Sequence, residues 1–213
     1  MVGRRVTRLA PVNTVRVPAE RLERWVANFT TRHGTTLLSV DDGALCGAAE
    51  DGSTFDARLP FATAYGGPAD PAVFAGSVSV PGDWGVLLVR KGGFAVARLA
   101  GLRMTDSKVG QRHVQGRTKA GGQSQQRFAR RRDNQARQAY EAAADHAARI
   151  LAGLRGPLAT GGDHTAVEEV LADPRLRGLE VTGPWLAVPD PRRSVLEEAV
   201  REACAVGVDV VNA

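Results

Sequence analysis

The chain has 213 residues, a hydrophobic fraction of 43% and a formal net charge of +5. This length allows one ordinary domain or a small domain followed by a larger one, and the apolar content is enough for a packed core, which excludes a disordered tail. No run approaches the roughly 18 uninterrupted apolar residues of a membrane span, and residues 1–17 lack the apolar segment of a secretory signal.

Residues 1–80 predict a small α+β module of unknown role. Pro18 is placed to open an amphipathic helix over residues 18–33. Short apolar runs typical of strands follow at 35–40, 43–48 and 54–61. From residue 65 to residue 83 the chain holds three prolines and four glycines, which predict a linker or an irregular crossing.

Residues 82–213 predict a second, larger domain. Two apolar runs, at 84–89 and 94–99, are separated by the turn sequence RKGG, which is typical of a β-hairpin. A third strand is predicted near Leu102. The stretch 107–123 is basic, contains glycines and shows no periodicity, so it predicts a loop.

Three helices are predicted after this loop. Apolar residues at spacings of four and three indicate a long amphipathic helix from about Ser124 to Leu154. Capping boxes beginning at Thr165 and Ser194 indicate two more helices. Two short apolar runs between those helices predict core strand, at 179–181 and 185–188. The order of these elements favours an α/β layered domain with a mixed sheet.

The positive charge is concentrated in one segment. Residues 103–138 contain ten basic side chains but only two acidic ones, Asp106 and Asp133, so this window carries +8 and the rest of the chain −3. A mildly acidic body with one cationic projection predicts a polyanionic partner, and nucleic acid is the favoured one.

The most informative sequence is GRTKAGGQSQQRFARRRDNQARQAYE, residues 116–141. Two adjacent glycines, Gly121 and Gly122, let the main chain approach another surface without Cβ clashes. Ser124 is a plausible N-cap, which would put the amides near Gln123 at the positive end of the helix dipole. Such a loop can stabilise an oxyanion or position water, but it offers no strong general base. A partner must therefore supply much of the chemistry.

The residues Gly121-Gly122-Gln123-Ser124, followed by Arg127-Phe128-Ala129-Arg130 and Arg132, resemble the GGQ segment of eukaryotic and archaeal class I release factors. The resemblance covers residues 82–213 and implies the RNase H-like α/β fold of their catalytic domain. Residues 1–80 contain no obvious codon-reading motif. A GGQ domain with a different N-terminal module is similar to the Vms-like release-factor family, whose actinobacterial branch acts as a stand-alone peptidyl-tRNA hydrolase in ribosome rescue.

The resemblance implies a role for each motif residue. Gly121 and Gly122 would let the loop enter the peptidyl-transferase centre of the large ribosomal subunit. The backbone N–H of Gln123 would stabilise the oxyanion or the leaving 3′-oxygen, and its side chain would restrict the nucleophile to water. Ribosomal RNA and peptidyl-tRNA would complete the site. The cationic residues expected to contact RNA phosphates are Arg117, Lys119, Arg127, Arg130, Arg131 and Arg132.

Other residues favour structural roles. Phe128 and Tyr140 are expected in the helix core, and one of the arginines at 130–132 could instead pair with Asp133 or Glu141. The histidines lie far from ligand-type partners, so no metal or cofactor is expected; they are His33, His113, His146 and His164. Cys46 and Cys204 predict buried, reduced thiols in a cytoplasmic protein. The presence of a single catalytic loop favours a monomer.

Three functions remain open from the sequence. The first is codon-independent hydrolysis of peptidyl-tRNA on stalled ribosomes. The second is a nuclease that cuts tRNA near its 3′-CCA end, although the loop offers no base or metal site unless His113 serves. The third is a ribosome-binding adaptor without catalytic activity, against which the intact Gly121-Gly122-Gln123 counts.

Overall fold

The computed structural model describes residues 12–111 and 123–213, with side chains described for residues 12–110 and 137–213. The chain forms two compact units. The first comprises Met1–Ser79 and Cys204–Ala213, and the second comprises Val80–Ala203. The C-terminal residues thus join the first unit, whereas the sequence predicted that they extend the second domain to residue 213.

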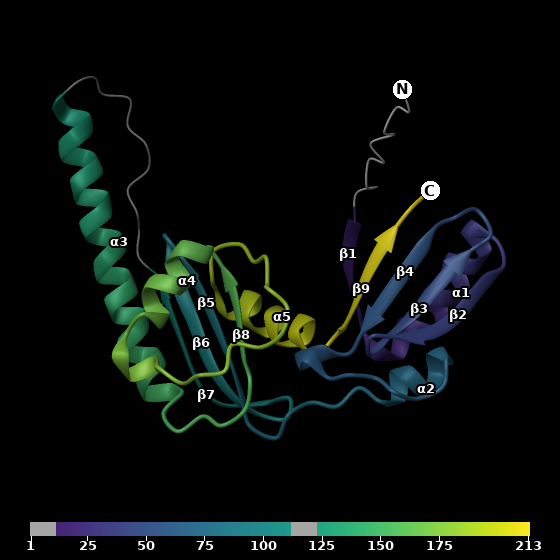
Figure 1. Ribbon diagram of the computed structural model, residues 1–213. Helices are drawn as coiled ribbons and strands as arrows, with labels where there is room; N and C mark the ends of the chain where they lie inside the picture. The colour runs from purple at the N-terminus through teal and green to yellow at the C-terminus, as the bar shows by residue number, and fades with distance from the viewer. Residues whose placement is uncertain (1–11, 112–122) are drawn as a thin grey trace, which may run out of the picture. The chain divides into compact units, whose positions relative to one another are not determined.

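The first unit is built on a five-stranded antiparallel sheet in the order β1-β9-β4-β3-β2. Its strands are β1 (Val12–Val17), β2 (Thr36–Asp41), β3 (Ala44–Ala49), β4 (Thr54–Arg58) and β9 (Val206–Val211). Helix α1 (Leu22–His33) packs on one face of this sheet after a short 3-10 turn, η1 (Ala19–Arg21). The helix predicted over 18–33 and the three predicted strands of residues 1–80 are confirmed. The strand β9, from the other end of the sequence, joins this unit to complete its sheet (Figure 1).

The core of the first unit lies between α1 and the sheet. Trp25 and Phe29 of α1 meet the fully buried Phe55 of β4 edge to face, with ring centroids 5.2 and 5.0 Å from it. On β9 the alternate residues Val206 and Val208 are fully buried in the same cluster. This alternation is what a strand with one covered face requires.

The predicted linker contains a short helix, α2 (Pro71–Gly76). Asp70 is its N-cap and accepts hydrogen bonds from the backbone N–H groups of Ala72 (2.8 Å) and Val73 (2.9 Å). Phe74 is fully buried and stacks edge to face on Tyr65. The capping carboxylate of Asp70 and the buried ring of Phe74 thus stabilise a helix in this segment, where the proline and glycine content predicted only a linker.

The second unit is built on a four-stranded mixed sheet in the order β7-β6-β5-β8. Its strands are β5 (Trp84–Arg90), β6 (Gly93–Ala100), β7 (Arg103–Gln111) and β8 (Leu158–Gly162). The first three run antiparallel and β8 is parallel to β5. The hairpin is confirmed, because Arg90 pairs with Gly93. The predicted loop begins too early, since β7 stays paired with β6 as far as Gln111.

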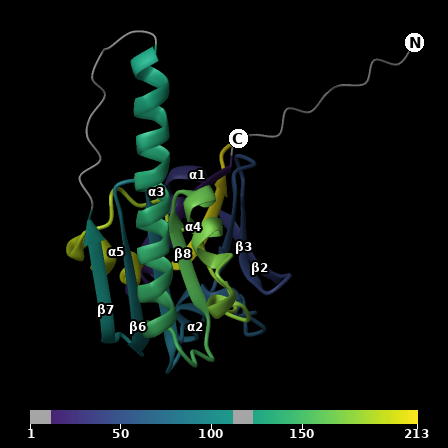
Figure 2. The same ribbon diagram turned by 90° about the vertical axis from the view of Figure 1, so that its left-hand side faces the viewer.

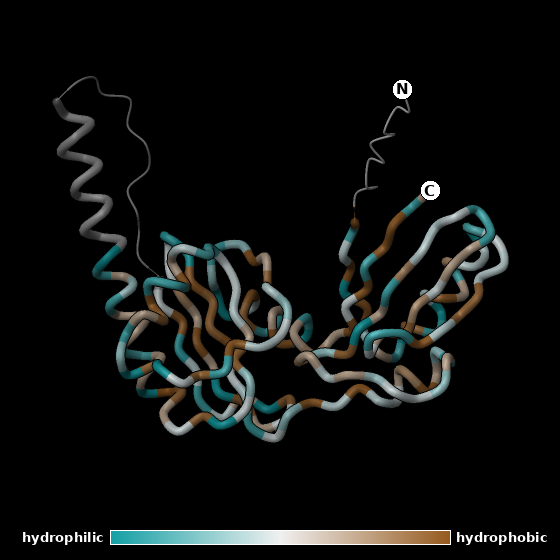
Figure 3. Tube along the Cα trace, in the orientation of Figure 1, coloured by the Kyte–Doolittle hydropathy of each residue, from teal (hydrophilic) through white to brown (hydrophobic). Residues whose placement is uncertain are grey.

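Helices cover both faces of this second sheet, which gives the predicted layered α/β arrangement (Figures 1 and 2). Helices α3 (Gln123–Ile150) and α4 (His164–Leu171) pack on one face, and α5 (Arg193–Ala203) packs on the other. Hydrophobic residues concentrate in the strands between them (Figure 3). The three helices predicted for this half of the chain are therefore confirmed.

Two local predictions in the second unit need correction. The N-cap of α4 is Asp163, whose carboxylate accepts from the N–H of Ala166, so the helix begins before the predicted box at Thr165. The predicted strands at 179–181 and 185–188 form only isolated bridges, Leu158 with Val181 and Gly161 with Leu186.

Both cysteines lie half-buried in the first unit and are free thiols. Burial raises the pKa of each thiol to about 11, and Asp56 adds to the shift of Cys46. Both thiols are more exposed than the sequence predicted, because they are half-buried and not buried. In the part of the chain that the structure describes, no helix has the length and apolar character to cross a membrane.

Candidate functional site

The residues predicted to carry function fall in and around the first half of α3. Gly121 and Gly122 lie outside the described residues, as do Arg117 and Lys119. Gln123 is the first residue of α3. The remaining predicted RNA contacts lie on the same helix, where the backbone alone is described: Arg127, Arg130, Arg131 and Arg132.

The helix starts one residue earlier than predicted, at Gln123, so Ser124 lies inside it and is not its N-cap. The first four N–H groups of an α-helix have no carbonyl partner within the helix. The N–H of Gln123 is one of these four. It therefore lies at the end of α3 where the helix dipole favours negative charge.

Helix α3 is longer than the sheet it packs against. Its 28 residues span about 42 Å, whereas the nine residues of β7, the longest strand, span about 30 Å. Among the side chains that are described, the buried ones begin at Ala139 and continue through Ala143, Ala147 and Ile150. Ala143, Ala147 and Ile150 join one core cluster with Leu87 of β5 and residues of β6. The C-terminal half of α3 is thus held against the sheet of the second unit.

Ion pairs attach the C-terminal half of α3 to its neighbours on two sides. Arg149 of α3 binds Asp106 of β7 at 2.7 Å. Arg175, in the 3-10 turn η3 (Pro174–Leu176), binds Asp145 of α3 and Asp173, each at 2.7 Å. Exposed pairs such as these contribute little stability individually, but they join α3 to its neighbours on both sides and oppose its rotation. The two pairs that involve α3 could not be predicted from the sequence, because Arg149 and Asp106 are 43 positions apart and Arg175 and Asp145 are 30 apart.

A third polar contact holds the C-terminal end of α3. Arg98 of β6 donates to both carboxylate oxygens of Asp83 (2.8 and 3.0 Å) and to the carbonyl of Ala152 (2.7 Å). Ala152 lies two residues beyond the end of α3, so the guanidinium is placed at the end of the helix dipole that favours a cation. The Arg98 guanidinium lowers the pKa of the Asp83 carboxyl, so the pair stays charged at neutral pH.

The contact of Arg175 with Asp173 predicts a measurable titration. Hydrogen bonds from Arg175 lower the pKa of Asp173 to about 2. A carboxyl with a depressed pKa stabilises the fold fully above its ordinary value, near 4, and loses that contribution as the pH falls toward 2. We expect carbon-detected NMR to show Asp173 titrating near pH 2 in the native chain. In Arg175→Ala its pKa should move toward the ordinary value, and an unmoved titration would contradict the assignment.

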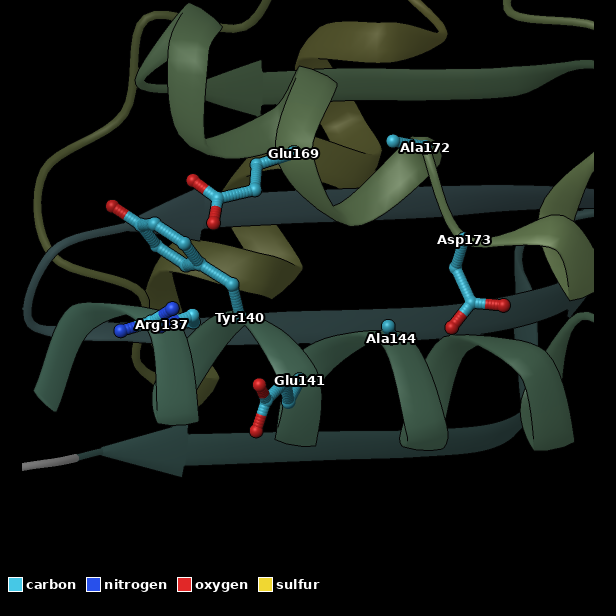
Figure 4. Close-up of a pocket in the computed structure, with 7 residues that line it drawn as sticks. All are labelled: Arg137, Tyr140, Glu141, Ala144, Glu169, Ala172 and Asp173. Atoms are coloured by element: carbon cyan, nitrogen blue, oxygen red, sulfur yellow. The ribbon is translucent and has the colours of Figure 1, made fainter. Parts of the chain in front are cut away.

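A shallow pocket of about 310 Å³ lies between α3 and α4, at the base of the cationic half of α3 (Figure 4). Tyr140 of α3 is 8% exposed, and its ring lies beside Glu169 of α4. Burial, followed by the charges of Asp163 and Glu169, raises the pKa of the Tyr140 hydroxyl, so it stays protonated at neutral pH. The prediction that Tyr140 belongs to the helix core is confirmed by its burial.

The histidines have structural neighbours. His33 contacts a carboxylate of Asp51 at 2.9 Å, while His146 and His164 stack on aromatic rings; His113 lies outside the described residues. Within the described ranges, no group of three His, Cys, Asp or Glu side chains is arranged to hold a metal ion.

Comparison with known proteins places the second half of the chain in a family. A sequence model described as the Actinobacteria/chloroflexi VLRF1 release factor matches residues 82–209, more than half of the chain. No curated protein sequence matches the chain. Among solved structures, the "Vms1 mitochondrial localization core" aligns with a TM-score of 0.42 and 10% identity, over 88% of this chain and 80% of that one. From the family match, the chain belongs to the Actinobacteria/chloroflexi VLRF1 release factors.

Proposed function

We propose that this protein is a peptidyl-tRNA hydrolase that releases nascent chains from stalled large ribosomal subunits in the cytoplasm, without reading a codon. The observation that carries the proposal is the release-factor family match over residues 82–209, which includes Gly121-Gly122-Gln123. The partners are ribosomal RNA at the peptidyl-transferase centre and peptidyl-tRNA, and the protein acts as a monomer.

The position of Gln123 at the start of α3 supports this chemistry. Hydrolysis of the ester develops negative charge on the carbonyl oxygen or on the leaving 3′-oxygen. An N–H donor aimed at that charge is the usual way to stabilise it, and the Gln123 N–H has no helical carbonyl to bind. Gly121 and Gly122 permit close approach to RNA. RNA supplies the remaining groups, because these three residues include no general base.

The length of α3 supports a role in delivering this group. Positions 127, 130 and 131 share one helix face, because residues three and four apart are neighbours on a helix. Ala143 follows position 127 by about four and a half turns, so these arginines belong to the face opposite the packed one. Arg132 precedes Ala143 by about three turns and shares its face. We propose that the first three contact phosphates along the outer face of α3, with Arg117, Lys119 and Arg132 as further contacts.

The sheet of the second unit is consistent with an RNase H-like fold, which we propose for residues 82–203. Three consecutive antiparallel strands, β5 to β7, are followed by a crossover through α3 to β8, which pairs parallel to β5. Leu186 then bridges to Gly161 in parallel, at the position of a further strand.

One assay tests the proposed activity against its two alternatives. Large subunits carrying labelled peptidyl-tRNA are incubated with the full chain, and the peptide is then resolved from tRNA. Free peptide with full-length tRNA supports hydrolysis. Peptide attached to a short tRNA remnant would replace the proposal with a nuclease, and intact peptidyl-tRNA on protein-bound subunits would replace it with an adaptor.

Subunit binding should be steeply sensitive to salt. If the six predicted cations contact phosphates, counterion release should weaken binding by about 10³-fold between 50 and 200 mM salt. Filter binding measures this slope. Replacing Arg130 and Arg131 by alanine should make it shallower. Replacing Arg24 and Arg32 by alanine, both exposed on α1, removes the same two charges elsewhere and should leave the slope unchanged. Equal slopes for the wild type and the double variant would count against these contacts.

A further inference from the structure

One aromatic pair on the second unit has the chemistry of a nucleobase platform. The rings of His164 and Trp185 stack with centroids 3.5 Å apart and planes 12° from parallel. His164 is exposed at the start of α4, whereas Trp185 is half-buried and packs against the core shared by α3 and α4. One face of the imidazole is covered by the indole. His164 as a whole is nevertheless exposed to solvent.

Among the described residues, the polar edges of these two rings have no hydrogen-bond partner. Within the part of the chain that the structure describes, no hydrogen bond joins the Trp185 indole N–H or the His164 ring nitrogens to another residue. A planar ligand with its own polar edge could use both the exposed ring and these groups.

The pair lies at the end of the sheet from which the GGQ segment leaves. Gln111, the last residue of β7, is paired with Gly93, and Gly93 is paired with Arg90 at the end of β5. The preceding residue of β5, Val89, is level with Gly162 of β8. His164 follows Gly162 by two residues, so it belongs to the same end of the sheet.

A cation lies at this end as well. Lys91 forms the hairpin turn after β5 and is exposed, and it is in no ion pair within the described ranges. Its neighbour Arg90 binds the carbonyl of Val188 at 2.7 Å and Asp190 at 3.6 Å. An exposed aromatic ring at the same end of the sheet as a cation suits single-stranded RNA, whose unpaired bases stack on aromatic rings while basic groups hold the phosphates.

We propose that the exposed face of His164, supported from behind by Trp185, stacks on an unpaired base of RNA. The site would give the second unit an RNA contact separate from the arginines of α3. The inference rests on the proposed RNA-facing role of this unit and adds a preference for unpaired bases.

The test compares a labelled single-stranded RNA hexanucleotide with an abasic strand of the same length, by fluorescence anisotropy with the full chain. The wild type should bind the base-bearing strand about tenfold more tightly, the range expected for stacking on one base. His164→Ala should lose this preference and bind both strands alike, whereas His164→Phe should retain it. Glu168→Ala, exposed on the same helix, should keep the preference.

Three outcomes would overturn the inference: a wild type that does not discriminate between the strands, His164→Ala with an undiminished preference, or His164→Ala weakened equally toward both strands. The last result would indicate a phosphate contact or a folding defect. The Gln123→Ala variant separates this inference from the proposed function, because it should retain the preference for base-bearing RNA. Peptide release without any base preference would refute the platform alone, and base preference without release would refute the hydrolase alone.

Discussion

Replacing Gln123 by alanine is expected to slow peptide release by about 10²-fold, since on the proposed function its side-chain amide positions the attacking water. Replacing it by proline should slow release by a further 10²- to 10³-fold, roughly the effect of removing one oxyanion donor. Gln123 is the first residue of α3, a position where proline is tolerated because its missing N–H has no helical partner. The pair of variants therefore separates the side chain from the backbone donor.

Single-turnover release from saturated subunits measures both effects, and co-sedimentation shows whether binding persists. Gln126→Ala, in the same first turns of α3, removes an identical amide and should release peptide at the wild-type rate. Equal rates for Gln123→Ala and Gln123→Pro would exclude the backbone N–H from the chemistry. A wild-type rate for both would remove Gln123 from the mechanism altogether.

The second large effect concerns folding. Val208→Asp should unfold the first unit and leave the second intact. Val208 is fully buried on β9, between β1 and β4, and an unpaired carboxylate in such a place costs roughly 3–5 kcal/mol. That is a large fraction of the stability of a small unit. The second unit, Val80–Ala203, takes no strand from this sheet.

Hydrogen exchange followed by mass spectrometry reads the two units separately. In Val208→Asp, peptides from β3 and β4 should exchange rapidly while those from β5 and β6 stay protected. Asn212→Asp adds the same charge at an exposed position just beyond β9 and should leave both units protected. Loss of protection in β5 and β6 would show that the two units fold as one.

Several elements could be predicted because their signals are local. The helix α1 and the long helix α3 follow from apolar spacing, and the β5–β6 hairpin follows from its turn residues. Helix α2 was missed because its prolines and glycines suggested a linker, although Asp70 and Pro71 form a helix start. No strand was predicted over β8, which contains Gly161 and Gly162. Gly161 is needed there because a Cβ would meet the Leu186 carbonyl.

The candidate site also combines features that the sequence shows directly with features that depend on the fold. The motif Gly121-Gly122-Gln123 and the charge of the segment around it are properties of consecutive residues, so they can be read without a fold. The ion pair of Arg149 with Asp106 joins residues 43 positions apart, and its charges resemble those of any exposed helix. The stacking of His164 on Trp185 likewise could not be predicted, because it depends on how two separate segments pack together in the folded chain.

By itself, the sequence determined that the protein is a two-part α/β chain with a cationic GGQ segment leading into a long helix. Local spacing, turn chemistry and charge depend on neighbours along the chain, and these are visible in the sequence. Only the tertiary structure decided that the last strand completes the sheet of the first unit and that α3 is fixed at its C-terminal half. Both depend on burial and on pairing between distant residues, whose free energy arises only once the chain has folded.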